Sequence, residues 1–371
     1  MQVRRHNTHI LHLDKMMLFG LLLLAVIGLL TLYSAGGQDI EIVVRQSIRI
    51  IIGLVLMTLL AQVRLQHVFY WVPWFYLGGV ILLVAVLFIG DSSKGSQRWL
   101  DFGVFRFQPS EVMKLGVPMM VAWFMAEKPL PPSYGRSFIT LLIIVIPVLL
   151  IAKQPDLGTS LLIASSGMFV LFLAGIQWWI VIFCTTAGVS LVVTAIYMPW
   201  VIKQFMHDYQ WKRVLTFLNP EADPLGAGYH IIQSKIAIGS GGIYGKGWLN
   251  GTQSHLEFLP ERTTDFIFAV YSEEFGLLGV FVLLGVYAFI LTRGLYMAIQ
   301  AQGTFARLLA GSVILTFFVY LLVNMGMVTG VLPVVGLPLP LVSYGGSSVV
   351  TLMAGFGFLM AAHTHRRLLS G

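Results

Sequence analysis

The chain has few charged residues and a single cysteine. Charged side chains make up 11% of its 371 residues, hydrophobic side chains make up 57%, and the mean hydropathy is +0.84. Soluble domains carry about 25% charged residues, so this composition excludes a soluble globular protein of this length. Cys184 lies within an apolar run, so it forms no disulfide within the chain and says little about the redox compartment.

Apolar runs long enough to cross about 30 Å of hydrocarbon recur along the whole sequence. They predict an all-α, polytopic integral membrane protein with about ten transmembrane helices. The predicted spans are residues 16–35, 43–62, 68–89, 108–125, 138–153, 158–174, 178–202, 264–292, 306–330 and 344–362. Because ten is an even number, both termini are expected on the same side of the membrane. No fixed-period repeat or low-complexity tract divides the chain, so residues 1–371 are interpreted as one transmembrane domain.

The distribution of Lys and Arg predicts the orientation of these spans. With both termini inside, the inner and the outer segments carry ten Lys and Arg residues each. The positive-inside rule counts short loops, however, and loop 203–263, between the seventh and eighth spans, has the length of about 60 residues at which charge stops governing topology. Without the six cations of that loop, the count is ten inside against four outside. Both termini are therefore predicted to be cytoplasmic and the large loop to face the exterior.

The net charge of +7 follows partly from this topology and does not indicate nucleic acid as a partner. Positive charge on the outer side suits an anionic lipid headgroup, and Arg213 belongs to an aromatic and basic patch at the start of the large loop. Residues 229–238 predict a short helix on the membrane surface. The glycine-rich segment 239–252 lacks the glycine and the hydroxyl residue that a P-loop requires. It is interpreted as a tight turn whose glycines allow positive φ.

Asp265 stands where a charged loop meets an apolar helix. An ionised group at membrane depth costs several kcal/mol unless it is paired or hydrated, which indicates a functional residue. The structural alternative is a carboxylate in the first helical turn, after an N-cap at Thr263 or Thr264, worth about 0.5–1 kcal/mol. Glu273 and Glu274 lie eight and nine residues further on, about 12–13 Å deeper in a continuous helix. They are expected to pair inside the bundle or to face a hydrated cavity.

Other charged groups are predicted at the outer ends of helices. Glu111 and Lys114 share a helix face at the start of the fourth span, so an ion pair between them is the structural interpretation. Asp156 begins a helix after the backbone break at Gln154-Pro155. Arg98, in the preceding outer loop, offers a planar guanidinium suited to phosphate oxygens. Carboxylates and cations gathered on one surface are difficult to explain by stability alone.

Residues 330–346 contain three prolines and several glycines, which preclude a continuous helix. Irregular backbone at membrane depth is tolerated only where it is buried in protein or lines a cavity. This segment, which includes Ser343, is therefore a candidate wall for a substrate groove.

At this point the motifs resemble those of the SEDS family over essentially the whole chain. They are KGSQRW at 94–99, FQPSE at 107–111, QPDLGTS at 154–160, the PLGAGYH…QS…IGSGG run at 224–242, LPERTTDFIFAV at 259–270 and LPVVGLPLPLVSYGGSS at 332–348. Val334-Val335 indicates the elongation branch, since division members usually carry Thr-Lys there.

The resemblance implies a peptidoglycan glycosyltransferase that polymerises lipid II on the outer face of the bacterial inner membrane. It assigns the family's essential aspartate to Asp265 and further site residues to Glu111, Lys114 and Asp156. It also implies a class B penicillin-binding protein, a single-span transpeptidase, as partner, within an elongation complex of MreB, MreC, MreD and RodZ.

The chemistry of the residues fits such an activity. An inverting transfer needs one general base, for which Asp265 is the candidate, and positive charge on the departing diphosphate. Arg98, Lys114, Arg213 or a divalent cation, Mg²⁺ or Mn²⁺, can neutralise that diphosphate. Gln154 and Ser343 complete the predicted substrate-binding set, and no other cofactor is expected.

Two other functions fit parts of the sequence. A flippase for lipid II would also show intramembrane charges and broken helices, and Glu273 and Glu274 favour it if they lie near the midplane. A non-catalytic scaffold for the transpeptidase would leave Asp265 dispensable.

Overall fold

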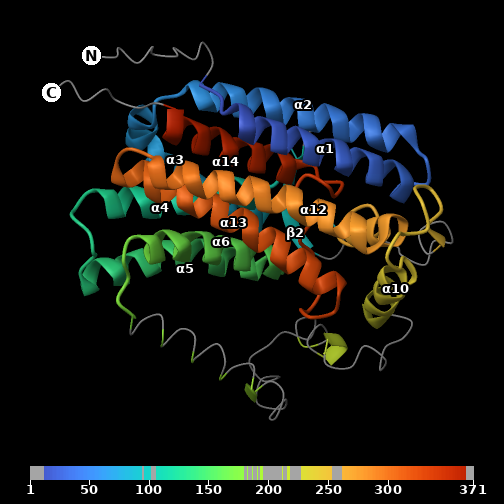
Figure 1. Cartoon of the computed structure of the whole chain (residues 1–371). Coiled ribbons are helices and arrows are strands. Elements are labelled where there is room, and N and C mark those ends of the chain that lie inside the picture. The colour runs from blue at the N-terminus through green and yellow to red at the C-terminus, as the bar shows by residue number, and fades with distance from the viewer. Residues whose placement is uncertain are drawn as a thin grey trace, which may run out of the picture.

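The computed structural model describes residues 12–93, 96–101, 106–178, 227–252 and 261–364, with isolated positions between 178 and 227. Its helices run roughly side by side and form an elongated bundle (Figure 1). The helices are α1 (Lys15–Ala35), α2 (Ile40–Gln62), α3 (Leu65–Ile89), α4 (Pro109–Ala126), α5 (Tyr134–Lys153), α6 (Leu157–Leu173), α10 (Ala227–Ser240), α12 (Ile267–Gln300), α13 (Thr304–Val328) and α14 (Ser347–Thr364). Between α3 and α4 lies a small antiparallel sheet of β1 (Asp91–Ser93), β2 (Ser96–Asp101) and β3 (Arg106–Phe107), in that order.

The all-α prediction is confirmed, and nine of the ten predicted spans coincide with described helices to within about eight residues at either end. Seven of the described helices are long and apolar enough to cross a membrane. The apolar α6 is shorter, with 17 residues, and α4 carries Glu111 and Lys114 in its first turns. The seventh predicted span, 178–202, lies outside the described residues, so the count of ten stays a prediction.

The two ends of the described chain meet at one end of the bundle, which we call the terminal end (Figure 1). There the Thr364 hydroxyl, at the end of α14, donates to the His12 carbonyl at 3.4 Å. The opposite end, called the site end, carries the sheet, the turn between α5 and α6, and residues 261–266. This arrangement agrees with the even number of spans that the sequence predicts.

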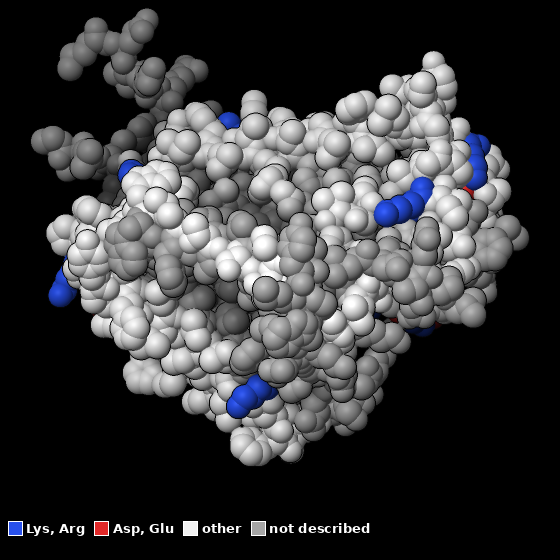
Figure 2. Space-filling model, turned by 90° about the horizontal axis from the view of Figure 1, so that it is seen from below, with Lys and Arg blue, Asp and Glu red and all other residues white. Residues whose placement is uncertain are grey.

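The flanks of the bundle are apolar, as expected for a surface in hydrocarbon. On α5, Phe138, Leu142 and Leu149 are exposed. The described part of the flank in Figure 2 carries only a few scattered charged side chains. In the interior, small residues allow close helix packing: a Cβ on Gly357 would lie 2.7 Å from the Met57 carbonyl, so α14 and α2 touch through backbone at this point.

The glycine-rich turn after α10 fills a break in α12. Gly276 has φ 63° and ψ −163°, which interrupts the helical hydrogen bonds. The Lys246 and Gly247 N–H groups donate to the Glu273 and Glu274 carbonyls at 3.0 and 2.9 Å. In return, the N–H groups of residues 277 and 278 donate to carbonyls of residues 242 and 243 at 3.0 and 3.1 Å. The turn thus supplies four hydrogen-bond partners to backbone groups that the break leaves without helical partners.

This contact explains the glycines of the segment. Gly245 has φ 78°, and a Cβ there would lie 2.1 Å from the Glu274 carbonyl oxygen. The interpretation of the segment as a tight turn is confirmed. The N–H groups of Lys246 and Gly247 are bonded to helix carbonyls, so these two donors do not point to a phosphate.

The segment between α13 and α14 is irregular, as its prolines predict, and it enters the bundle at the site end. The Tyr287 hydroxyl on α12 donates to the Pro340 carbonyl at 2.7 Å. The Leu341 carbonyl oxygen would lie only 2.4 Å from a Cβ at Gly28, so α1 accepts the segment because it has glycine there. The inner part of the segment, residues 337–343, is mostly buried in protein, which is the condition for irregular backbone at this depth, whereas Val331 and Gly336 are exposed.

The terminal end is closed by an ion pair between α1 and α12. Arg293 Nε and Nη2 donate to the two carboxylate oxygens of Asp14 at 3.1 and 2.5 Å. Asp14 also caps α1 by accepting from the Met17 N–H at 2.8 Å. Burial by itself raises the pKa of Asp14, but the hydrogen bonds from Arg293 and Met17 outweigh burial and leave the pKa below its usual value.

We therefore expect Asp14→Asn to destabilise the protein by about 1 kcal/mol at neutral pH, because Asn keeps the cap and loses the ion pair. A lowered folded pKa means that the contribution is present above the unfolded value of about 4 and is lost as pH falls through the folded value. The measurement is the melting temperature in detergent from pH 7 to pH 3. The gap between variant and parent should close below about pH 4; a gap of constant size would contradict the ion-pair assignment.

Candidate functional site

Asp265 lies in a turn at the site end, immediately before α12. The N–H groups of Thr264 and Phe266 both donate to the Glu261 carbonyl, at 3.2 Å each, and this closes the turn. The N-cap of α12 is Phe266, without a side-chain capping bond. The prediction of an N-cap at Thr263 or Thr264 is therefore wrong, because the chain is still turning at these residues. The half-buried Asp265 precedes the helix rather than occupying its first turn.

The backbone around Asp265 is held by the segment between α13 and α14. The Asn324 amide on α13 donates to the Asp265 carbonyl at 2.9 Å and to the Leu337 carbonyl at 2.7 Å. The Ser343 hydroxyl donates to the Thr264 carbonyl at 2.6 Å. These bonds fix the turn against an irregular segment whose residues 339–343 are buried, so the Asp265 turn has a rigid support.

Ser343 acts within this support. It is 1% exposed, and its hydroxyl also accepts from the Leu339 N–H at 2.7 Å. Both hydrogen-bonding functions of the hydroxyl are thus used inside the protein. The geometry assigns Ser343 to positioning of the Asp265 turn, whereas contact with a substrate stays a prediction.

Asp156, Gln154 and Arg98 come together at the site end, as the sequence predicts. Asp156 caps α6 by accepting from the Thr159 N–H at 3.1 Å, and it lies 3.7 Å from Arg98 Nη1. Arg98 also donates to the Gln154 carbonyl at 3.3 Å and to the Pro155 carbonyl. The buried Gln154 side chain donates to the Leu83 carbonyl of α3 at 3.1 Å. The cluster joins β2 to the α5–α6 turn and leaves the Arg98 charge balanced.

Glu111 and Lys114 form the ion pair that their spacing predicts. Lys114 Nζ lies 2.6 Å from Glu111 Oε1, both residues are buried, and the ammonium lies 5.4 Å from the centre of the Tyr320 ring. Within the described part of the chain, Glu111 Oε2 has no hydrogen-bond partner, and neither has Thr316 Oγ1.

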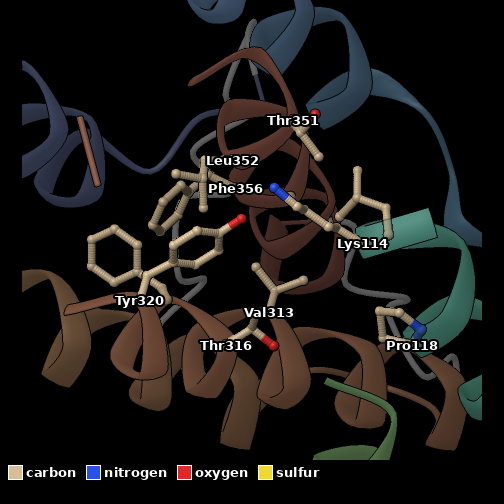
Figure 3. A pocket seen from close by; sticks show the side chains of 11 residues that line it. Lys114, Pro118, Val313, Thr316, Tyr320, Thr351, Leu352 and Phe356 are labelled. Carbon is tan, nitrogen blue, oxygen red and sulfur yellow. The ribbon is translucent and has the colours of Figure 1, made fainter. Parts of the chain in front are cut away.

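A small cavity borders this pair (Figure 3). Lys114, Thr316, Tyr320 and Thr351 are among its lining residues, and the ammonium of Lys114 points across it toward the Tyr320 hydroxyl. About 30 Å³ is open to the centre of a water molecule, which is enough for one or two waters. The pair therefore borders a small cavity inside the bundle that is mostly apolar but has room for water.

Glu273 and Glu274 lie at the site end and not near the midplane. Glu273 is fully buried and accepts from Lys246 Nζ at 2.7 Å and from the Thr252 N–H at 2.9 Å. Glu274 accepts from the Ser34 hydroxyl, one residue before the end of α1. The expected pairing is confirmed. Their expected depth below Asp265 stays a prediction, because the break of α12 at Gly276 follows both glutamates and leaves the helix between them and Asp265 intact.

Three residues near Asp265 were missed by sequence reasoning. Asn324 and Arg49 are polar residues within apolar runs. This pattern is visible in the sequence and could have identified both as candidate site residues. His230 on α10 stacks on Phe266 with ring centres 5.8 Å apart. Burial lowers the pKa of His230, although the charge of Glu261 acts in the opposite direction, so His230 is neutral at pH 7.

These contacts do not test two of the predictions, the role of Arg213 and the binding of a metal ion. Arg213 lies outside the described residues. Among the described residues, no group of three or more His, Cys, Asp and Glu side chains could hold a metal ion. Mg²⁺ is commonly held by one or two carboxylates together with substrate phosphates, so a divalent cation at Asp265 stays a prediction.

Fold and site together define a multi-pass membrane protein with a carboxylate on a rigid turn at one end of its helical bundle. Residues 7–368 match the model of the FtsW/RodA/SpoVE family, described as cell cycle proteins. The chain belongs to this family.

Its relatives match over nearly the whole chain. It is 55% identical to the peptidoglycan glycosyltransferase MrdB of Escherichia coli K12, over 97% of this chain and 95% of the relative. It is 34% identical to a probable peptidoglycan glycosyltransferase FtsW of Trichlorobacter lovleyi, over 97% and 95%.

Solved structures match as well. A structure described as the coordination of polymerization and crosslinking by a peptidoglycan synthase complex gives a TM-score of 0.81 at 30% identity, covering 95% of this chain and 99% of that one. The rod shape determining protein RodA of Thermus thermophilus gives 0.69 at 28% identity, covering 94% and 96%.

The Glu111–Lys114 pair allows a stability prediction. Glu111→Gln or Lys114→Met alone leaves one buried charge without its partner and should cost about 3–5 kcal/mol, whereas both changes together should be nearly neutral. We expect each single variant to melt well below the parent in detergent and the double variant to melt close to it. Additive losses in the double variant would contradict the pairing.

Proposed function

We propose that this chain is a peptidoglycan glycosyltransferase that polymerises lipid II into glycan strands during cell elongation and so regulates cell shape. The names of its relatives support the activity. The observation that carries the proposal is the Asp265 turn: a half-buried carboxylate at the site end, on backbone fixed by Asn324 and Ser343. A base held rigidly at the edge of the bundle can meet a sugar while a lipid tail stays in hydrocarbon.

In the proposed reaction Asp265 is the general base. The carboxylate accepts the proton of the acceptor GlcNAc 4-hydroxyl while the oxygen attacks C1 of the donor sugar. The new glycosidic bond forms as the bond to the diphosphate breaks, with inversion at C1. The undecaprenyl diphosphate takes the bonding electrons and leaves without protonation, so one carboxylate is enough. Cations near the diphosphate stabilise the charge that develops.

The geometry argues against the two alternative functions, a flippase and a scaffold. A flippase is favoured by charges near the midplane, but Glu273 and Glu274 lie level with the end of α1 and are engaged by Lys246 and Ser34. A scaffold would not need the turn around Asp265 to be fixed by hydrogen bonds from two segments.

The protein is further proposed to act with a class B penicillin-binding protein. Support comes from the related synthase complex, whose description couples polymerization to crosslinking. MreB, MreC, MreD and RodZ are proposed as the wider complex. A divalent cation, Mg²⁺ or Mn²⁺, is proposed to neutralise charge on the diphosphate. The site end is proposed to face the exterior of the inner membrane.

Asp265→Asn tests the catalytic assignment. Asn keeps the shape of the side chain but accepts no proton, and loss of a general base costs about 10²–10⁴ in rate. We expect the purified variant, with its transpeptidase partner and lipid II, to bind the partner and to make no glycan ladder on a gel. Asp39→Asn is the matched control, because Asp39 caps α2 at the same end and Asn also caps. Polymerisation by Asp265→Asn within a few-fold of the parent would move the base to Asp156 or Glu111.

Fusions test the orientation. Alkaline phosphatase is active only outside the cytoplasm, so a fusion after Lys246 at the site end should be active. A fusion after Arg136, in the first turn of α5 at the terminal end, should be inactive. The reverse pattern would overturn the assignment of the site end to the exterior.

A further inference from the structure

A diphosphate leaving group needs positive charge. Of the three basic residues named from the sequence, Arg213 lies outside the described residues, and the other two are already engaged. Lys114 is paired with Glu111 at 2.6 Å, and Arg98 faces Asp156 and two carbonyls. Binding a diphosphate through either would first require breaking these contacts. A cation at the site end without a carboxylate partner is a better ligand for an anion.

Arg49 on α2 meets this requirement. It lies nine residues into the helix, about 14 Å from its site end, where an arginine without a counter-charge is costly. Its guanidinium lies over the Tyr344 ring, 4.5 Å from the ring centre. Within the described residues, Nη1 is buried and has no hydrogen-bond partner. A buried cationic donor at this depth indicates a missing anion.

Arg49 is connected directly to the Asp265 turn. The Tyr344 N–H donates to the Thr263 carbonyl at 2.8 Å, two residues before Asp265. Gln46, one turn before Arg49, donates to the Ser343 carbonyl at 3.2 Å and so holds α2 against the same segment. Side chains on a helix lean toward its N-terminus, which for α2 is the site end, so Arg49 reaches toward the level of Asp265.

The surroundings of Arg49 suit a lipid with an anionic headgroup. On the side of α2 away from the bundle, Val44, Ile48 and Ile52 are exposed, and these residues would face hydrocarbon. Arg49 lies between this apolar flank and the buried side that contains Gln46. A lipid lying along the flank would bring its headgroup to the guanidinium while its tail stays in the bilayer.

We propose that Arg49 binds the diphosphate of the lipid-linked donor, whose polyprenyl tail lies along the exposed flank of α2. The assignment rests on the proposed function and adds a substrate-binding residue to it. The guanidinium of Arg49 offers two parallel N–H donors to diphosphate oxygens, and it stabilises the negative charge that the diphosphate gains when its bond to the sugar breaks.

The test compares Arg49→Gln with Arg45→Gln. Arg45 is the matched control, because it lies one turn away on the same helix, is exposed and pairs with Glu41. We expect Arg49→Gln to raise the KM for lipid II about tenfold or more, since a charge-assisted bond is lost. Arg45→Gln should stay within about threefold of the parent, because an exposed pair contributes little. Equal kinetics of Arg49→Gln and parent would overturn the proposal.

A direct binding measurement tests the diphosphate site independently of the polymerisation activity. Undecaprenyl diphosphate and undecaprenyl monophosphate are titrated against the purified full chain. The parent is expected to bind the diphosphate more tightly than the monophosphate. Arg49→Gln is expected to lose that preference. If the parent makes no glycan but shows an Arg49-dependent preference, the proposed activity fails and the diphosphate site stands. A preference that survives in Arg49→Gln overturns the site.

Arg49→Lys covers the case in which Arg49→Gln does not fold, as judged by melting in detergent. It keeps the charge but loses the paired donors, so it is expected to fold and to bind the diphosphate more weakly than the parent. Binding by Arg49→Lys equal to that of the parent would show that paired donation is not used and would contradict the proposed contact.

Discussion

Hydrogen bonding of non-helical backbone is the constraint on which the site end of this protein depends. Lipid offers no partner for a free N–H or carbonyl group, so each departure from the helix must be satisfied within the protein. Two such departures lie in the described part of the site end: the break of α12 at Gly276 and the irregular segment between α13 and α14. The first is satisfied by the glycine-rich turn, and the second is tied to the Asp265 turn and to α2. The site is therefore built from backbone that could not exist alone in a membrane.

This construction has a chemical consequence. A general base works only if its carboxylate is held close to the proton that it accepts, and small displacements are costly. The Asp265 turn is bonded through the carbonyls of Thr263, Thr264 and Asp265 to Tyr344, Ser343 and Asn324. These three bonds use backbone carbonyls and do not involve the carboxyl group of Asp265.

The charges of the site end divide into two groups. In the first group, carboxylates and cations neutralise each other, as in Glu111–Lys114, Glu273–Lys246 and Asp156–Arg98. Such pairs join helices and loops, and their mutual neutralisation keeps them tolerable at low dielectric. Arg49 belongs to the second group, because its guanidinium meets an aromatic ring and no carboxylate among the described residues. An anionic ligand of Arg49 would therefore not have to displace a carboxylate of the described residues.

The sequence by itself determined the class of fold, the positions of most spans and the residues that gather at one end, because apolar length and charge position are local properties of a chain in a bilayer. It also identified Asp265, since a carboxylate beside an apolar run is visible without coordinates. Only the tertiary structure decided that Asp265 precedes its helix, that Gly276 breaks α12, and that Ser343 and Asn324 hold the turn. These features depend on contacts between residues far apart in the chain, such as Asn324 with Asp265, and no local pattern specifies which distant group satisfies a given carbonyl.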